Sequence, residues 1–238
     1  MVMQGLAKSR EQAVSLLMSG KVFVNQKRVE KSGQQVPIDS KIDLKGKTHP
    51  WVSRGGIKLE KAILEFNLNC ESVTALDIGA STGGFTDVLL ANGADKVYAV
   101  DVGYGQLDWK LRQDKRVIVK EKTNARFLTN QIITDSLDAI VCDASFISLK
   151  KVLPSGLKLL KNNGWLAALI KPQFEVGKGL VGKGGVVRNS ELHKEVKNDI
   201  KNWLQFEMKM NLLGIVDSPI LGPSGNKEFI IVATKLLN

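Results

Sequence analysis

The chain has 238 residues, 43% of them hydrophobic, which is enough for one large domain or for one ordinary domain with a small appendage. It carries 34 lysines and arginines against 24 aspartates and glutamates, and this net charge of +10 favours a phosphate-rich partner such as a nucleic acid. Two cysteines and two histidines provide neither a disulfide framework nor a metal-type spacing, and no window reaches the apolar length of a membrane span. We therefore expect a reduced, cytoplasmic protein without a bound metal.

The first 47 residues hold nine basic and four acidic side chains, which is half of the net charge. A helix is predicted between Ser9, which can cap its first turn, and Gly20, which can end it in a left-handed conformation. Short strands are predicted to follow, at Val22–Val24, Arg28–Val29 and Ile38–Leu44. A small α-then-β unit is therefore expected here, with a boundary near Pro50, because proline biases its predecessor toward extended structure.

After Trp51 the pattern changes to alternating strands and helices. Strands are predicted at Ala75–Ile78, Val97–Val100, Val117–Val119, Ala139–Val141, Trp165–Ile170, Leu212–Val216 and Phe229–Val232. Helices are predicted at Phe85–Ala91, Gln106–Arg112, Leu149–Leu160 and Ser190–Phe206. This alternation predicts an α/β domain whose mostly parallel sheet is covered by helices on both faces.

A turn of small residues, from Gly79 to Gly84, joins the first of these strands to the next helix. Such a turn lets the backbone approach a ligand closely, and Asp101, at the end of the second strand, can hold the hydroxyls of a ribose. The turn lacks the Gly-Lys-Ser/Thr of a P-loop and does not match Gly-x-Gly-x-x-Gly. Asp77, just before it, favours a cationic ligand such as S-adenosylmethionine. The alternative is a structural turn beside a solvated Asp101.

Four charged residues are candidates for catalysis. Asp143 and Lys171 each follow a predicted strand and are expected at the same sheet edge as Asp101. Lys171 is the candidate general base for a ribose hydroxyl, which requires its ammonium form to be disfavoured, and Lys58, Asp143 and Glu228 would position it and the substrate. The alternative is four ordinary surface or ion-paired residues.

A glycine-rich stretch follows Lys171. Five glycines between positions 177 and 185 predict a mobile loop, and Lys178, Lys183 and Arg188 lie on it or beside it. This loop is a candidate lid that clamps RNA phosphates, with a merely flexible loop as the alternative. Phe174 is a candidate for base stacking or for the core.

Several segments together resemble one known family, the TlyA or hemolysin A-like proteins, in which an S4 RNA-binding domain precedes an FtsJ-like methyltransferase domain. The most specific are Trp51–Gly55, Gly79–Thr86, Asp101–Leu107, Thr123–Arg126, Ser145–Leu149, Lys171–Gly179 and Gly222–Asn226, with Leu6–Arg10 and Gly20–Asn25 matching the S4 signature. The resemblance implies a Rossmann-like methyltransferase sheet, mostly parallel with an antiparallel last strand. It also implies 2′-O-methylation of ribosomal RNA, typically at cytidine, with S-adenosylmethionine as cofactor.

The resemblance also implies roles for individual residues. The Lys-Asp-Lys-Glu tetrad of the family falls on Lys58, Asp143, Lys171 and Glu228. Cofactor contacts are expected at Gly79, Ala80, Ser81, Gly83, Gly84, Phe85, Asp101 and Asn124, together with Asp77. RNA contacts are expected at Lys8, Ser9, Arg10, Lys21, Lys27 and Arg28, and in the larger domain at Arg54, Lys178, Lys183 and Arg188.

The expected organisation is an S4-like domain at residues 1–47 that lacks the first helix of that module, a linker at 48–53 and a methyltransferase domain at 54–238. Ribosomal RNA or a ribosomal subunit is the expected partner. Two other interpretations stay open, a protein that binds cofactor and RNA without catalysis, and a membrane-active hemolysin. The target nucleotide, the ribosomal subunit and the oligomeric state are left undetermined by the sequence.

Overall fold

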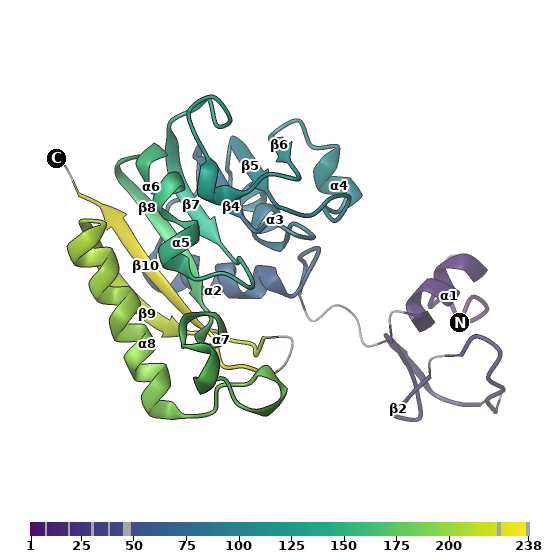
Figure 1. Cartoon of the computed structure of the whole chain (residues 1–238). Helices are drawn as coiled ribbons and strands as arrows, with labels where there is room; N and C mark the ends of the chain where they lie inside the picture. The colour runs from purple at the N-terminus through teal and green to yellow at the C-terminus, as the bar shows by residue number, and fades with distance from the viewer. Residues whose placement is uncertain are drawn as a thin grey trace. The chain divides into compact units, whose positions relative to one another are not determined.

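The computed structural model describes residues 1–7, 9–18, 20–29, 31–37, 39–44, 49–222 and 225–236. The chain divides into two compact units, Met1–Pro50 and Trp51–Asn238, each of which is described by itself (Figure 1). Within the described ranges, none of the helices combines the length and the apolar character that crossing a membrane requires.

Within its described residues, the smaller unit contains one helix and a three-stranded antiparallel sheet. Helix α1 spans Arg10–Met18, and the strands, in the order β2-β1-β3, are β1 Val22–Val24, β2 Lys27–Arg28 and β3 Ile42–Leu44. A tight turn joins β1 to β2, in which Asn25 and Gln26 have φ angles of 47° and 67°, as a hairpin between twisted strands requires. The third strand is shorter than predicted, and Ile38 lies outside the described residues.

The larger unit is built on a seven-stranded sheet in the order β6-β5-β4-β7-β8-β10-β9. The strands are β4 Thr74–Ile78, β5 Lys96–Val100, β6 Val117–Lys120, β7 Leu137–Cys142, β8 Leu160–Ile170, β9 Met210–Asp217 and β10 Phe229–Lys235. The pairs from β6 to β8 are parallel, whereas β10 runs antiparallel to both β8 and β9. The predicted mostly parallel sheet with an antiparallel last strand is therefore confirmed.

Two helical layers cover this sheet, one on each face (Figure 1). One layer contains α2 Gly55–Phe66, α3 Gly84–Ala91 and α4 Trp109–Arg112. The other contains α5 Leu149–Val152, α6 Pro154–Leu159 and α8 Ser190–Asn202. Successive strand residues point to opposite faces, so that Ala75 packs in the core beneath α2 and α3 while Leu76 packs in the core beneath α5 and α6. Burial on both faces explains why these strands are apolar throughout.

Short elements complete the larger unit. They are the 3-10 turns η1 Ala125–Phe127, η2 Lys178–Leu180 and η3 Lys183–Gly185, the helix α7 Pro172–Glu175, and the π-helical turn η4 Trp203–Glu207 that continues α8.

Two predicted helices differ from those observed, and one observed helix was not predicted. The helix expected at Leu149–Leu160 is divided at Pro154, which lacks an N–H and begins α6 instead. The helix expected at Gln106–Arg112 begins only at Trp109, after Asp108 accepts a hydrogen bond from the Lys110 N–H. Helix α2 was not predicted at all, because its first two residues are glycines with poor helix propensity.

Candidate active site

The register of the sheet brings the candidate residues to one edge. Ile78 pairs with Val100 and with Cys142, so the residues that follow these strands, Gly79, Asp101 and Asp143, emerge next to one another. In sheets of this kind, ligands bind beyond the carboxyl ends of the parallel strands, which is where these three residues lie.

The antiparallel strand β10 completes the arrangement from the opposite direction. Phe229, its first residue, pairs with Ile170, the last residue of β8. Glu228 and Lys171 are therefore brought to the same edge, although 57 positions separate them in the chain. Lys58 reaches this edge from the first turn of α2.

The four tetrad residues form one continuous chain of ion pairs. Lys171 Nζ lies 2.6 Å from Asp143 Oδ1, and Lys58 Nζ lies 3.4 Å from Asp143 Oδ2. Lys58 Nζ also donates to Glu228 Oε2 at 2.7 Å. Lys171 Nζ donates in addition to the carbonyl oxygen of Asp143 at 3.1 Å and to Ser145 Oγ at 2.9 Å. The structure thus brings all four predicted residues together.

Burial makes this chain of charges unusual. Lys58 and Lys171 are each 6% exposed and Glu228 is 1% exposed, whereas Asp143 is half-buried. A buried charge is tolerated when it is paired, and here two cations offset two anions, although Glu228 Oε1 has no hydrogen-bond partner among the described residues. Such a neutral, partly desolvated cluster has the composition of a site for proton transfer rather than of a solvated surface.

The glycine turn has a conformation that other residues would not adopt. Gly79 has a φ of +79°, and a Cβ there would lie 2.9 Å from Ala144 Cα. Gly83 has a φ of +92° and immediately precedes α3. The turn therefore keeps bare backbone at the sheet edge, where a side chain at position 79 would press on the segment after Asp143.

Asp101 and Asn124 have defined orientations next to this turn. Asp101 Oδ2 accepts from the Ser81 N–H at 2.8 Å, and its Oδ1 accepts from the Gly103 N–H at 2.7 Å. Asn124 Oδ1 accepts from the backbone N–H of Arg126 at 3.1 Å and from the side-chain Nε–H of Arg126 at 3.2 Å. These bonds fix both side chains before any ligand arrives, which lowers the entropic cost of binding.

Two adjoining cavities open at the sheet edge. The larger has a volume of about 1050 Å³, and its lining includes Asp101, Asn124, Phe146 and Phe174. The smaller has a volume of about 300 Å³, and its lining includes Lys58, Lys171, Asp77, Ala80, Gly84, Phe85 and Arg54. Gly79, Ser81, Asp143 and Ser145 border both. The larger cavity is of the size that holds a cofactor, and the smaller one is lined by three of the four tetrad residues, Lys58, Asp143 and Lys171.

Asp77 is fully buried at the inner wall of the smaller cavity. Its Oδ2 accepts from Thr86 N at 3.0 Å and from Thr86 Oγ1 at 2.7 Å, and among the described residues its Oδ1 has no hydrogen-bond partner. Burial raises the pKa of this carboxyl from 3.8 to about 7, and the nearby charges of Asp143 and Asp101 contribute in the same direction. Asp77 Oδ2 therefore holds the first turn of α3 through Thr86, while Asp77 Oδ1 remains available as an acceptor.

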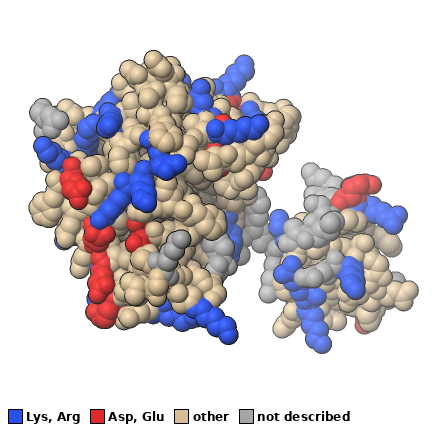
Figure 2. All heavy atoms as spheres, in the orientation of Figure 1, with Lys and Arg blue, Asp and Glu red and all other residues tan. Residues whose placement is uncertain are grey.

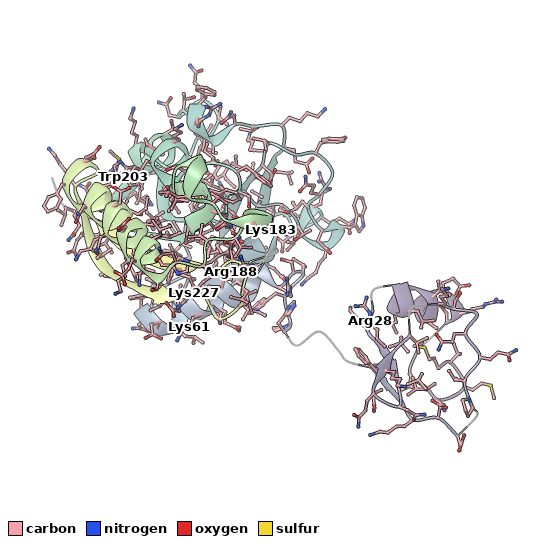
Figure 3. The ribbon with its side chains drawn as sticks, turned by 60° about the horizontal axis from the view of Figure 1, so that its bottom comes forward. Arg28, Lys61, Lys183, Arg188, Trp203 and Lys227 are labelled. Atoms are coloured by element: carbon pink, nitrogen blue, oxygen red, sulfur yellow. The ribbon has the colours of Figure 1, made fainter. Side chains whose placement is uncertain are left out.

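The residues expected to contact RNA are distributed over both units. In the smaller unit Arg10, Lys27 and Arg28 are exposed, while Ser9 and Lys21 are half-buried, and Figure 2 shows lysine and arginine side chains spread over its visible face. Lys8 lies outside the described residues, as does the side chain of Lys178. In the larger unit Arg54, Lys183 and Arg188 are exposed, and Figure 3 shows how Lys183 and Arg188 lie.

Models of two protein families match the chain. The FtsJ-like methyltransferase model matches residues 51–235, and the S4 domain model matches residues 1–42. The chain belongs to the FtsJ-like methyltransferase family.

Relatives of this FtsJ-like methyltransferase extend over both units. TlyA of Mycobacterium tuberculosis, a 16S/23S rRNA (cytidine-2′-O)-methyltransferase, is 44% identical over 97% of this chain and 86% of its own length. Hemolysin A of Brachyspira hyodysenteriae is 40% identical over 95% of this chain and 94% of its own length. Among solved structures, a Streptococcus thermophilus protein named as a candidate hemolysin has a TM-score of 0.79 at 43% identity, covering 98% of this chain and 86% of that one.

A more distant solved structure shares the fold. Fibrillarin of Aeropyrum pernix, solved with natively bound S-adenosyl-L-methionine, has a TM-score of 0.53 at 15% identity and covers 85% of each chain. At this identity the likeness concerns the fold alone.

Sequence reasoning missed two polar residues of the FtsJ-like site. Ser145 accepts from Lys171, and Gln106 lines the larger cavity and accepts from Ser81 Oγ at 3.3 Å. A signal for Ser145 was present, because it follows Asp143 by two positions at a strand end. Gln106 carried none, since it was assigned to a helix that begins only three residues later.

Proposed function

We propose that the protein is an S-adenosylmethionine-dependent ribose 2′-O-methyltransferase that acts on ribosomal RNA, with cytidine as the expected target. The observation that carries this proposal is the buried ion chain Lys171–Asp143–Lys58–Glu228 next to the glycine turn. The printed function of the TlyA relative supports the same reaction. Action on ribosomal RNA would also place the protein in the cytoplasm.

The residues at the sheet edge fit S-adenosylmethionine. Asp101 keeps lone pairs after accepting from two N–H groups and would hold the ribose hydroxyls, and Asn124 would contact the adenine. The bare backbone at Gly79 would adjoin the methionine end. Asp77 Oδ1, which has no hydrogen-bond partner among the described residues, would accept from the ammonium of this ligand. When bound, this cofactor supplies an electrophilic methyl group.

Lys171 would accept the proton of the ribose 2′-hydroxyl. Its Nζ contacts three acceptors, Asp143 Oδ1, the Asp143 carbonyl and Ser145 Oγ, and this is the arrangement of a charged ammonium. The ammonium must therefore lose a proton to solvent before each reaction. The neutral amine then keeps two N–H groups for two of these acceptors, and its lone pair takes the hydroxyl proton in place of the third contact.

Lys58 has a different role from Lys171. Glu228 and Asp143 both hold its ammonium, so its charge is fixed in position. A fixed cation in a desolvated site would stabilise the negative charge that develops on the ribose oxygen as its proton leaves. Glu228 would thus act by placing Lys58, while Asp143, in contact with both lysines, sets their separation.

We propose that the smaller unit binds ribosomal RNA as an S4-like domain at residues 1–47 and that the methyltransferase domain occupies residues 54–238. The exposed cations Arg10, Lys27 and Arg28 support the first part, because phosphate neutralisation with counterion release dominates RNA affinity. Arg54, at the rim of the smaller cavity, is placed to hold a phosphate next to the reacting ribose.

The direct test is transfer of a labelled methyl group. The protein is incubated with methyl-labelled S-adenosylmethionine and separately with small subunits, large subunits and whole ribosomes, and the labelled ribose is mapped. We expect label in one or both subunits at a 2′-oxygen. Absence of transfer to every substrate, by protein that binds the cofactor, would refute the proposed function and favour binding without catalysis.

A further inference from the structure

Asn226 is a buried polar residue that belongs to no role described so far. It is 2% exposed, and both ends of its side-chain amide are engaged. Its Oδ1 accepts from the Val187 N–H at 2.9 Å, and its Nδ2 donates to the Gly185 carbonyl at 2.9 Å. The amide thereby joins two segments that are about 40 positions apart in the chain.

The first of these segments carries exposed positive charge. Lys183 and Arg188, at its two ends, are exposed, and within the described part of the chain neither forms an ion pair (Figure 3). Between them the backbone is held at Val187, whose carbonyl contacts His193 Nε2 at 2.8 Å. The segment is therefore held at Val187 and presents two cations that have no ion-pair partner among the described residues, which suits binding of backbone phosphates.

The second segment leads directly into the tetrad. Asn226 lies two residues before Glu228, and its own carbonyl accepts from the Gly222 N–H at 2.9 Å. Gly222 packs so closely on Glu228 that an added Cβ would collide with Glu228 Oε1. A displacement of Asn226 would therefore move the carboxylate that holds Lys58 at 2.7 Å.

We propose that Asn226 is a positioning residue that couples RNA contact to catalysis. It ties the segment bearing Lys183 and Arg188 to the segment bearing Glu228, so that phosphates bound by the first fix the Lys58–Glu228 pair in the second. This inference rests on the proposed function. The physical basis is that binding energy from a remote part of the substrate raises the rate only when it improves geometry at the reacting centre.

The test combines changes at Asn226 with a change at Arg188. Asn226→Leu removes both hydrogen bonds at similar volume, and Asn226→Asp keeps the acceptor for Val187 but loses the donor to Gly185. Asn211→Leu is the matched control, because Asn211 is exposed on β9 and its side-chain amide donates a long hydrogen bond of 3.5 Å to Thr234 Oγ1. For each protein, kcat and KM for the ribosomal subunit, cofactor affinity and thermal melting are measured.

We expect Asn226→Leu to lower kcat by roughly 10- to 100-fold, as a misplacement of about 1 Å does, with cofactor affinity changed by less than about twofold. Asn226→Asp should lie between this variant and the wild type, and Asn211→Leu should match the wild type. Arg188→Ala should lower kcat and raise KM in the wild type, but only raise KM in the Asn226→Leu background, because the coupling is already lost.

Two results would overturn the inference. One is an Arg188→Ala effect on kcat that is equal in the two backgrounds, and the other is an Asn226→Leu variant in which KM alone changes. Should Asn226→Leu melt before the assay temperature, Asn226→Asp serves for the same comparison. Failure of the wild-type protein to methylate any subunit would instead refute the proposed function.

Discussion

Replacement of Asp77 by asparagine tests the electrostatics at the inner wall of the site. Asparagine can still accept the two hydrogen bonds from Thr86, but it cannot ionise. Burial raises the pKa of Asp77 to about 7 from an ordinary value of 3.8. The folded protein therefore binds a proton at Asp77 between about pH 4 and pH 7, where the unfolded chain has already released it.

The magnitude follows from the size of this shift. A pKa difference of about 3 units between the folded and the unfolded protein changes the free energy of unfolding by roughly 4 kcal/mol over the pH range in which Asp77 titrates. About 3 kcal/mol of this change falls between pH 5 and pH 8. The sign is fixed, because a group whose pKa is raised on folding stabilises the protein at low pH and loses this contribution as the pH rises through the folded value. The wild type should therefore lose stability relative to Asp77→Asn as the pH is raised.

Urea unfolding followed by tryptophan fluorescence measures this difference in the larger unit, because all four tryptophans lie there. The free energy of unfolding is determined for both proteins at pH 5 and pH 8 without cofactor. Between pH 5 and pH 8, the free energy of unfolding of the wild type should fall by about 3 kcal/mol relative to that of Asp77→Asn. A difference that is the same at both pH values would show that Asp77 is ionised throughout and would refute the reasoning.

Three further outcomes are expected. Gly79→Ala should lower the free energy of unfolding by about 2 kcal/mol, because a Cβ at a φ of +79° meets Ala144 Cα at 2.9 Å. Gly177→Ala is the control: a Cβ at Gly177 meets no atom within 4 Å, so this variant should be nearly as stable as the wild type in the same urea titration. Asp101→Asn should weaken cofactor binding by about tenfold in a calorimetric titration while RNA affinity stays unchanged, and equal weakening of both would contradict its role. Ser145→Ala should lower kcat by roughly three- to tenfold in the methyl-transfer assay, since it removes one acceptor from Lys171, and an unchanged kcat would exclude this contact from catalysis.

The sheet and one half of the tetrad could be predicted from the sequence alone. Apolar runs followed by Asp143 and Lys171 mark strand ends, and parallel strands bring their ends to one edge. Lys58 and Glu228 were expected to position Lys171 and the substrate, and the family resemblance implied the same tetrad, but no local pattern showed how they reach this edge. Lys58 lies on a helix that begins with two glycines, so local propensity gave no signal, and the position of Glu228 depends on an antiparallel register that no local pattern specifies.

Other features depend on contacts that are distant in the chain. In the sequence, Asn226 follows Gly225 and precedes Lys227, and it looks like an ordinary turn residue. Its hydrogen bonds to Gly185 and Val187 join distant parts of the chain and cannot be predicted from the local pattern. Asp77 was expected to favour a cationic cofactor, but its hydrogen bonds to Thr86, and hence its structural role, follow from the approach of α3 to β4. Tertiary packing, rather than local pattern, sets both.

The central claim is that Lys171 removes the ribose proton, and single-turnover methyl transfer by Lys171→Ala tests it most directly. Asp143 keeps its contact with Lys58 in this variant, so the fold should persist. Lys161→Ala, which breaks an exposed pair with Asp138, is the matched control. We expect Lys171→Ala to transfer methyl groups at least about 100-fold more slowly than the control while both bind cofactor and ribosomal subunits normally. Transfer by Lys171→Ala within a few fold of the control rate would contradict the account.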